Sequence, residues 1–224
     1  MLQYFMYNRG NFDFLDIVFL VLTYAVLILV VLPFHEFAHA FVAHLCGDDT
    51  AKWNGRLTLN PFVHLTVYGV VMLVVCGFGT ARPVPVNPMN FRNRKRDSIL
   101  VSLAGPLSNL LMAVLSVAIF CLVAMTRNML AIEIAIMVCL QILFPINITL
   151  AVFNLLPIPP LDGSRLWSTF LPVKWRITLE QYSQYFILAL FVLLMTGVLD
   201  GPLNMLTSLI GNAVFRMFGL PFYF

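Results

Sequence analysis

The segment LPFHEFAHAFVAHLCG, residues 32–47, decides how the rest of the chain is interpreted. It follows 18 uncharged residues at 17–34 and places His35, Glu36 and His39 within about one and a half helical turns. Ionisable side chains are costly inside a membrane and usually mark a function there. These three residues therefore indicate a chemical site, provided that the flanking segments cross a membrane.

The composition is that of a membrane protein. Of 224 residues, 61% are hydrophobic and only 10% are charged, whereas soluble domains have about 45–50% apolar and about 25% charged residues. A transmembrane helix needs about 20 consecutive apolar residues. We therefore expect an all-α polytopic membrane protein with about five long transmembrane helical elements. These elements correspond to the charge-free runs 17–34, 98–126, 134–161, 181–199 and 201–215.

Residues 57–81 are also uncharged, but they make a poor simple spanning helix. Polar, proline and glycine residues interrupt the run at Asn60, Pro61, His64, Gly69, Gly77 and Gly79. We expect a re-entrant or extended segment near 47–90, which is tolerated at membrane depth only where protein or a wet cavity surrounds it. Residues 1–224 are expected to form a single domain. The first apolar run is expected to be retained, not cleaved as a signal peptide, because it leads into HEFAH.

The basic residues orient the chain, because Lys and Arg that flank membrane spans are retained on the cytoplasmic side. If the N-terminus lies outside and the segments 47–61 and 80–97 lie inside, 11 of the 13 Lys and Arg residues are cytoplasmic. Only Arg9 and Arg127 are then outside. This arrangement predicts a C-terminus inside and a site that opens toward the cytoplasm. The net charge of +3 follows from this bias and gives no reason to expect nucleic acid as a partner.

His35 and His39 are four residues apart, so on a helix both imidazoles project from one face and can reach one ion. Glu36 lies beside them, where it can touch a water molecule on that ion without being a ligand. HExxH is thus the spacing of a zinc hydrolase in which the carboxylate is the general base. Two other interpretations stay open from these residues alone: the histidines could hydrogen-bond within the helix bundle, or they could ligate a haem.

A hydrolytic zinc site needs a third protein ligand and one open position. The segment FNLLPIPPLDGSRLW, residues 153–167, supplies one acidic side chain, Asp162. Three prolines before it end the preceding helix, and Gly163 permits a tight turn. Asp162 could therefore point into a cavity as the third ligand, or it could cap a short helix that begins near Ser164.

Together, these two segments resemble the site-2 protease family of intramembrane zinc metalloproteases, in particular its compact bacterial members. HEFAH lies in an early membrane helix, and NLLPIPPLDG (154–163) lies late in the chain. Three further segments look like parts of the same members: GRLTLNPFVH (55–64), FGTARPVPVNPMNFRN (78–93) and LAGPLSNLL (103–111). The resemblance covers roughly residues 30–170.

The resemblance implies that His35, His39 and Asp162 hold one Zn²⁺ per chain and that Glu36 activates water. It implies that Asn154 contacts the substrate, although this amide could also hydrogen-bond the backbone nearby. It further implies a multi-pass protein of a bacterial cytoplasmic membrane, whose substrate is a transmembrane protein in the lipid bilayer. A regulatory membrane protein or a second copy of the chain would be a further partner.

Two other residues of the matching segments are expected near the site. His64 could support the ligands or control access to them, and Asn109 could approach the site. A loop hydrogen bond and helix packing are the plainer roles for them. Parts of 55–90 are implied to form re-entrant strands that pair with an unwound substrate. The sequence departs from the family pattern H-x-D-x-x-G, because Thr66 stands at the acidic position; this leaves the role of the loop open.

We therefore expect a zinc metalloendopeptidase that hydrolyses peptide bonds within or near transmembrane segments of membrane proteins. The alternative is a non-enzymatic metal transporter or channel that uses the same ligands. Transport favours weak, exchangeable binding and polar residues spread along several helices. This chain instead concentrates its polar groups at one depth, beside a single carboxylate placed as a general base, which favours the enzyme.

Overall fold

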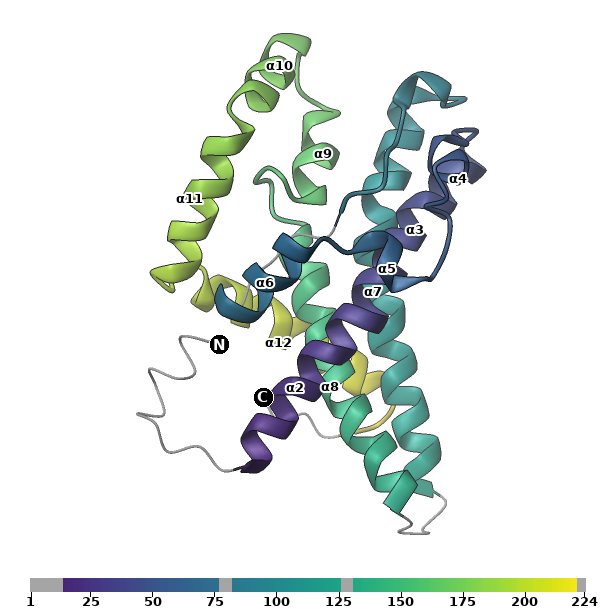
Figure 1. The fold of residues 1–224 in the computed structure, drawn as a ribbon, viewed down its shortest axis with the longest axis vertical. Helices are drawn as coiled ribbons and strands as arrows, with labels where there is room; N and C mark the ends of the chain where they lie inside the picture. The colour runs from purple at the N-terminus through teal and green to yellow at the C-terminus, as the bar shows by residue number, and fades with distance from the viewer. Residues whose placement is uncertain (1–13, 77–81, 126–130, 221–224) are drawn as a thin grey trace.

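The structure is a computed structural model that describes residues 14–76, 82–125 and 131–220 (Figure 1). The described residues form helices and no strand, which confirms the all-α expectation. The elements, in chain order, are α2 (Phe14–Val26), the π-helix η1 (Leu27–Val31), α3 (Leu32–Leu45), α4 (Thr50–Trp53), α5 (Pro61–His64), α6 (Val67–Cys76), the 3-10 helix η2 (Pro88–Asn90), α7 (Arg94–Met125), α8 (Ala131–Asn154), α9 (Asp162–Ser168), α10 (Val173–Gln181), α11 (Ser183–Met195) and α12 (Asp200–Met217).

The described helices include two that are long and apolar enough to cross a membrane. These are Val21–Leu45, which runs through η1 into α3, and α7. The pair Val173–Leu179 and Ser183–Met195, bent by 62°, would add a third span if it forms one. The described apolar helix Leu140–Asn154 is shorter. The five crossings expected from the sequence therefore remain a prediction.

The distribution of side chains around α7 is that of a helix in a membrane. Apolar side chains three or four residues apart are exposed along one face: Leu107, Leu111, Leu115, Ile119 and Leu122. Small and polar residues lie on the buried faces, among them Gly105, Ser108 and Ser116. Small residues let membrane helices approach one another closely, while lipid covers the large apolar ones. This pattern and the apolar spans indicate a membrane protein.

The central helices α3, α7 and α8 position the site. α7 packs most extensively against α8 and next against α3, and it runs back along α3 in the opposite direction (Figure 1). A core of apolar side chains joins α7 and α8 to α12: Ala113, Val117, Phe144, Ile148, Val152, Leu203 and Val214. By packing against α7, α8 therefore helps to hold α7 in its position against α3.

The segment between α3 and α7 is irregular, with short helices. The described part of α6 has 10 residues and ends where the description of the chain stops, so the re-entrant path expected for 57–81 stays a prediction. Residues 82–87 are extended but pair with no strand among the described residues. The strands implied within 55–90 are thus not formed there, and residues 77–81 lie outside the described ranges.

Gly47 and Asp48 turn the chain at the end of α3 and fix it there. Gly47 has φ +103, which favours glycine, and the amides of Gly47 and Asp48 donate to the carbonyls of His44 and Ala43 in a Schellman motif. Asp48 is completely buried. Its carboxylate accepts hydrogen bonds from the Asn87 amide at 2.6 Å and from Asn90 Nδ2 at 2.8 Å. The end of α3 is thereby tied to the segment that leads into α7.

The Asp48 carboxylate also accepts the amide and hydroxyl of Thr50. Burial alone would raise the pKa of Asp48, but its hydrogen bonds to Thr50, Asn87 and Asn90 outweigh burial, so the pKa lies below its ordinary value. A carboxyl with a lowered folded-state pKa stabilises the fold fully above its unfolded-state pKa of about 3.9. That contribution is lost as the pH falls through the folded-state pKa.

We expect Asp48→Ala to lower the free energy of unfolding at pH 7 by about 1–3 kcal/mol, because several donors lose their acceptor. The variant should also show a weaker loss of stability below about pH 4 than the wild type. Chemical denaturation in detergent at several pH values measures both effects. Asp49→Ala is the matched control, because the Asp49 side chain is 36% exposed and, among the described residues, pairs with the His44 side chain alone. Equal stability of wild type and Asp48→Ala would contradict the structural role of this carboxylate.

Candidate metal centre

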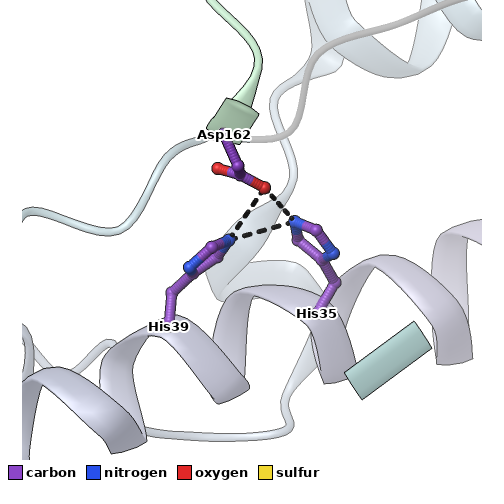
Figure 2. A group of neighbouring side chains, drawn as sticks. All are labelled: His35, His39 and Asp162. Carbon is purple, nitrogen blue, oxygen red and sulfur yellow. Dashed lines mark hydrogen bonds and ion pairs between the residues drawn. The ribbon is translucent and has the colours of Figure 1, made fainter. Parts of the chain in front are cut away.

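Three side chains from two distant helices meet at one point (Figure 2). His35 and His39 project from the same face of α3 toward Asp162, the first residue of α9. Asp162 Oδ2 lies 3.1 Å from His35 Nε2 and 3.2 Å from His39 Nε2, and the two Nε2 atoms are 3.1 Å apart. The structure thus brings together the three residues that the sequence suggested as ligands.

This triangle fits a tetrahedral zinc ion. With zinc–ligand bonds of about 2.0–2.1 Å, tetrahedral ligand atoms lie roughly 3.3–3.4 Å apart, close to the 3.1–3.2 Å observed. Two imidazoles and one carboxylate form a donor set that is common in catalytic zinc sites, which keep a fourth position open. The residues present therefore fit the ion.

The backbone of α7 orients one of the histidines. His39 Nδ1 lies 2.7 Å from the carbonyl oxygen of Val101, so Nδ1–H donates to that oxygen and Nε2 keeps its lone pair for a metal. His35 Nδ1 is buried and has no hydrogen-bond partner among the described residues. The tautomer of His39 is thus set by a contact between α3 and α7.

Two glycines permit the close approach of the three ligands. A β-carbon on Gly105 of α7 would lie 2.3 Å from His39 Nε2 and 2.4 Å from His35 Cε1. A β-carbon on Gly163 would lie 2.3 Å from the carbonyl oxygen of Leu155. No side chain fits at such distances, so Gly105 makes room for the imidazoles, and Gly163 lets α9 begin against the end of α8.

Asp162 faces the two histidines and does not cap the helix, so it is placed where a third ligand could be. α9 begins at Asp162 itself, and the residue before it makes no side-chain cap. Burial alone would raise the pKa of Asp162, but hydrogen bonds and charge from His35 and His39 outweigh burial, so its pKa lies well below the ordinary value. Asp162 is therefore ionised at neutral pH, as a metal ligand must be.

Glu36 is held beside the ligands by the extended segment 82–87. Its Oε2 accepts a hydrogen bond of 3.1 Å from the Val84 amide, and the pair is buried. Arg56, only 4% exposed, keeps this segment in place by donating to the carbonyls of Arg82 at 3.0 Å and Pro83 at 3.3 Å. The same guanidinium donates to the carbonyl of Val63. One carboxylate oxygen of Glu36 is thus fixed, and the other is available for a proton.

A cavity of about 370 Å³ opens at the three ligands. Its wall includes the three ligands, Glu36, Asn154 and Arg165. The remaining lining residues are apolar and come from six segments, namely α3, 82–87, α7, α8, 160–161 and α11: Leu32, Pro83, Val84, Val86, Val101, Leu150, Phe153, Pro160, Leu161, Ile187 and Leu190. An apolar cavity with a few convergent polar groups is typical of a binding site. The space suits an apolar peptide segment.

Asn154 lines this cavity at the end of α8. Its Nδ2 donates to the Leu150 carbonyl at 3.0 Å, which is the backbone hydrogen bond considered as its plainer role. An amide nitrogen carries two hydrogens. The hydrogen bond to Leu150 therefore uses one of the two and leaves the other uncommitted.

His64 and Asn109 do not line the cavity. His64 is completely buried in the loop, where its Nε2 lies 2.8 Å from the Thr58 carbonyl oxygen and its own carbonyl accepts the Arg82 amide. Asn109 is completely buried in α7, and neither of its side-chain polar atoms has a partner among the described residues. The structure places His64 as a support of the loop and leaves Asn109 away from the cavity wall.

Sequence reasoning missed several residues at the site. The Val84 amide and Gly105 act through the backbone, and Arg165, Ile187 and Leu190 come from segments after the second motif. The three-residue spacing of Arg165 from Asp162 was a readable signal, because such residues share a helix face. The others carry no signal in one sequence.

We expect Gly105→Ala to weaken zinc binding by about 10–100-fold, the range for losing groups that orient metal ligands. The added methyl overlaps both imidazoles. Competition with a chromophoric chelator measures the affinity. Gly201→Ala is the matched control, because a β-carbon there meets no atom within 4 Å. Unchanged zinc affinity in Gly105→Ala would show that the imidazoles do not need this space.

Comparisons with known proteins agree with this geometry. The sequence profile of peptidase family M50 matches residues 23–128 and 121–197. The chain is 43% identical over 178 residues to YwhC of Bacillus subtilis, a candidate zinc metalloprotease, covering 77% of this chain and 80% of YwhC. It is 34% identical over 180 residues to Rip2 of Mycobacterium tuberculosis, also a candidate zinc metalloprotease, covering 77% of this chain and 66% of Rip2. No solved structure matches the chain.

The profile match spans most of the chain and includes both ligand-bearing segments. Both relatives are named as zinc metalloproteases, and the two imidazoles and one carboxylate of this chain form a donor set suited to zinc. The chain belongs to peptidase family M50, the site-2 protease family, and is a zinc metalloprotease of the membrane.

Proposed function

We propose that this protein is an intramembrane endopeptidase in which His35, His39 and Asp162 hold one Zn²⁺ and Glu36 is the general base. The observation that carries the proposal is the approach of Asp162 Oδ2 to within 3.2 Å of both Nε2 atoms. Proteases of this family act on membrane proteins within the bilayer, and an apolar cavity at the ligands suits such a substrate.

Zinc, when bound, supplies a Lewis acid that polarises the scissile carbonyl and makes water acidic enough to react near neutral pH. The free oxygen of Glu36 takes a proton from the attacking water, and Glu36 later returns that proton to the nitrogen of the leaving amine. The Val84 amide holds the other Glu36 oxygen, so the carboxylate keeps its orientation in both steps. Asn154 donates its second N–H to a carbonyl of the substrate.

The substrate has to unwind before it reacts. In a transmembrane helix every backbone carbonyl is already hydrogen-bonded within the segment, so an intact helix does not offer its scissile carbonyl to the site. Substrate segments with helix-breaking residues are therefore favoured. Water and the unwound segment meet in the cavity beside Asn154, Pro160 and Leu161.

The proposed topology has five crossings, an N-terminus outside and a site that opens toward the cytoplasm. Figure 1 supports an alternating path for the first three of these spans, because α3 ends and α7 begins on one side of the molecule, where α9 and α10 also lie. α7 ends and α8 begins on the opposite side. The strong bias of Lys and Arg to the first side orients it toward the cytoplasm. In a bacterium this would be the cytoplasmic membrane.

The transporter alternative gains no support. Among the described residues, one group of side chains could hold a metal ion, whereas transport requires a path with several weak sites. The profile match and the named relatives are those of proteases. A single closed group of ligands beside a general base favours hydrolysis.

We expect Glu36→Gln to retain zinc and to lose peptide cleavage by about 10²–10⁴-fold, the usual contribution of a general base. The amide keeps the size of the side chain and can still accept the Val84 N–H, so the ligands are not disturbed. Purified protein is assayed on a synthetic transmembrane peptide, and its zinc content is measured by mass spectrometry.

Asp200→Asn serves as the control for this experiment, because it makes the same chemical change at an exposed residue of α12. It should leave both zinc content and cleavage unchanged. Full cleavage by Glu36→Gln would remove the general base from the proposal. Zinc flux into liposomes without any cleavage would favour the transporter.

The topology is tested by single cysteines in a variant without the four native ones. We expect Val198→Cys to react with a membrane-impermeant maleimide from outside the cell, whereas Asn54→Cys and Leu171→Cys react only after permeabilisation. All three positions are exposed. Labelling of Asn54→Cys in intact cells would contradict the proposed orientation.

A further inference from the structure

Arg165 stands in the wall of the metal cavity. It lies in α9 three residues after Asp162, so both side chains are on one face of that short helix. It lines the same cavity as the three ligands and Glu36. Among the cavity-lining residues it is the one Lys or Arg.

Arg165 is exposed, and its guanidinium has no hydrogen-bond or ion-pair partner among the described residues. In the described ranges, Asp162 pairs with the two histidines and not with Arg165. Two other arginines show what an engaged guanidinium looks like here: Arg56 donates to backbone carbonyls, and Arg96 pairs with Asp97. Arg165 thus offers its five N–H donors to a ligand in the cavity.

The charge balance of the cavity favours an anion. The carboxylates of Glu36 and Asp162 offset the two charges of a bound zinc ion, which leaves the positive charge of Arg165. Positive-inside topology explains cations on the outer surface, such as Lys95, which lies 5.3 Å from the ring of Phe170. Arg165 is counted by that rule too, but unlike the other Lys and Arg residues of the described chain it also lines the cavity.

The chemistry of the site identifies the kind of anion. Guanidinium binds a carboxylate in a planar, bidentate arrangement, which gives direction as well as affinity. The apolar side chains of Phe153, Ile187 and Leu190, which line the same cavity, suit an apolar stretch of peptide. A peptide that satisfies both surfaces is an unwound apolar segment with one acidic group near the scissile bond.

We propose that Arg165 binds a carboxylate of the substrate beside the metal centre and makes the protease selective for segments with an acidic residue near the cleaved bond. This rests on the function proposed above. The carboxylate comes from a side chain or from the end of a shortened substrate chain. A lysine or arginine at the same position is repelled.

The test compares a series of synthetic transmembrane peptides with amidated C-termini that differ at one position. A single Glu, Gln or Lys is moved stepwise across the cleaved region, and the rate of cleavage is measured for wild type, Arg165→Gln and Arg165→Glu. A second series ends in a free carboxylate at the position that wild type prefers. The selectivity is read within each variant as the ratio of the Glu and Lys rates, so a smaller folded fraction cancels.

We expect wild type to cleave the best Glu peptide roughly ten-fold faster than its Lys counterpart, the size of one hydrogen bond between charged groups. Arg165→Gln should make the two rates similar, and Arg165→Glu should reverse the preference. Arg176→Glu is the matched control, because it makes the same charge change at an exposed residue of α10 that does not line the cavity. Its ratio should equal that of wild type. An effect of Arg165 confined to the second series would assign the carboxylate to a chain end.

An equal ratio in wild type and Arg165→Gln, with cleavage that still depends on Glu36, would overturn the role of Arg165 and leave the proposed function standing. Equal shifts in Arg165→Glu and Arg176→Glu would also overturn it, because the effect would then belong to the net charge of this side of the protein. A lack of Glu36-dependent cleavage with every peptide would overturn both proposals together.

Discussion

Asp162 contacts the two histidines of α3, although it lies 123 positions after His39 in the sequence. To form this contact, the fold has to remove all three side chains from water. Burial of a carboxylate and two imidazoles is costly unless they satisfy one another or bind an ion. The short contacts among the three groups offset this cost, and zinc adds coordination that further favours the assembled site. Every other feature of the site either shortens these contacts or keeps them in place.

Close backbone approach is the means by which the helices deliver the ligands. Gly105 lets α7 pass directly behind the imidazoles, and the Val101 carbonyl of the same helix then fixes the ring of His39. Gly163 lets α9 start against the carbonyls at the end of α8, which presents Asp162 from the opposite side. The antiparallel α7–α8 pair thus carries both the support of the histidines and the chain that leads to the carboxylate.

The sequence was informative where side-chain spacing determines chemistry. The four-residue spacing of His35 and His39 and the lone acid after three prolines led to the three side chains that meet in space. The apolar runs predicted the all-helical class of the fold. They did not determine how many times the chain crosses the membrane, because length alone does not separate a span from a bent or re-entrant helix. His64 and Asn109 were expected near the site because they belong to matching segments; both are buried and neither lines the cavity, and a supporting role for them stays a prediction. The hydrogen bond from the Val84 amide to Glu36 could not be predicted from the sequence, because every residue type except proline carries the same backbone N–H.

Arg56 makes the loop after α3 important for the site, although Arg56 is not one of the zinc ligands. Its guanidinium joins the carbonyls of Val63, Arg82 and Pro83, and the next amide along holds Glu36. The orientation of Glu36, the residue proposed as general base, therefore depends on a cation that is not itself part of the cavity wall. In a random mutagenesis screen, substitutions in the segment 55–64 would therefore reduce activity as substitutions at the metal centre do. A survey of loss-of-function variants would then overstate the number of residues that contact substrate.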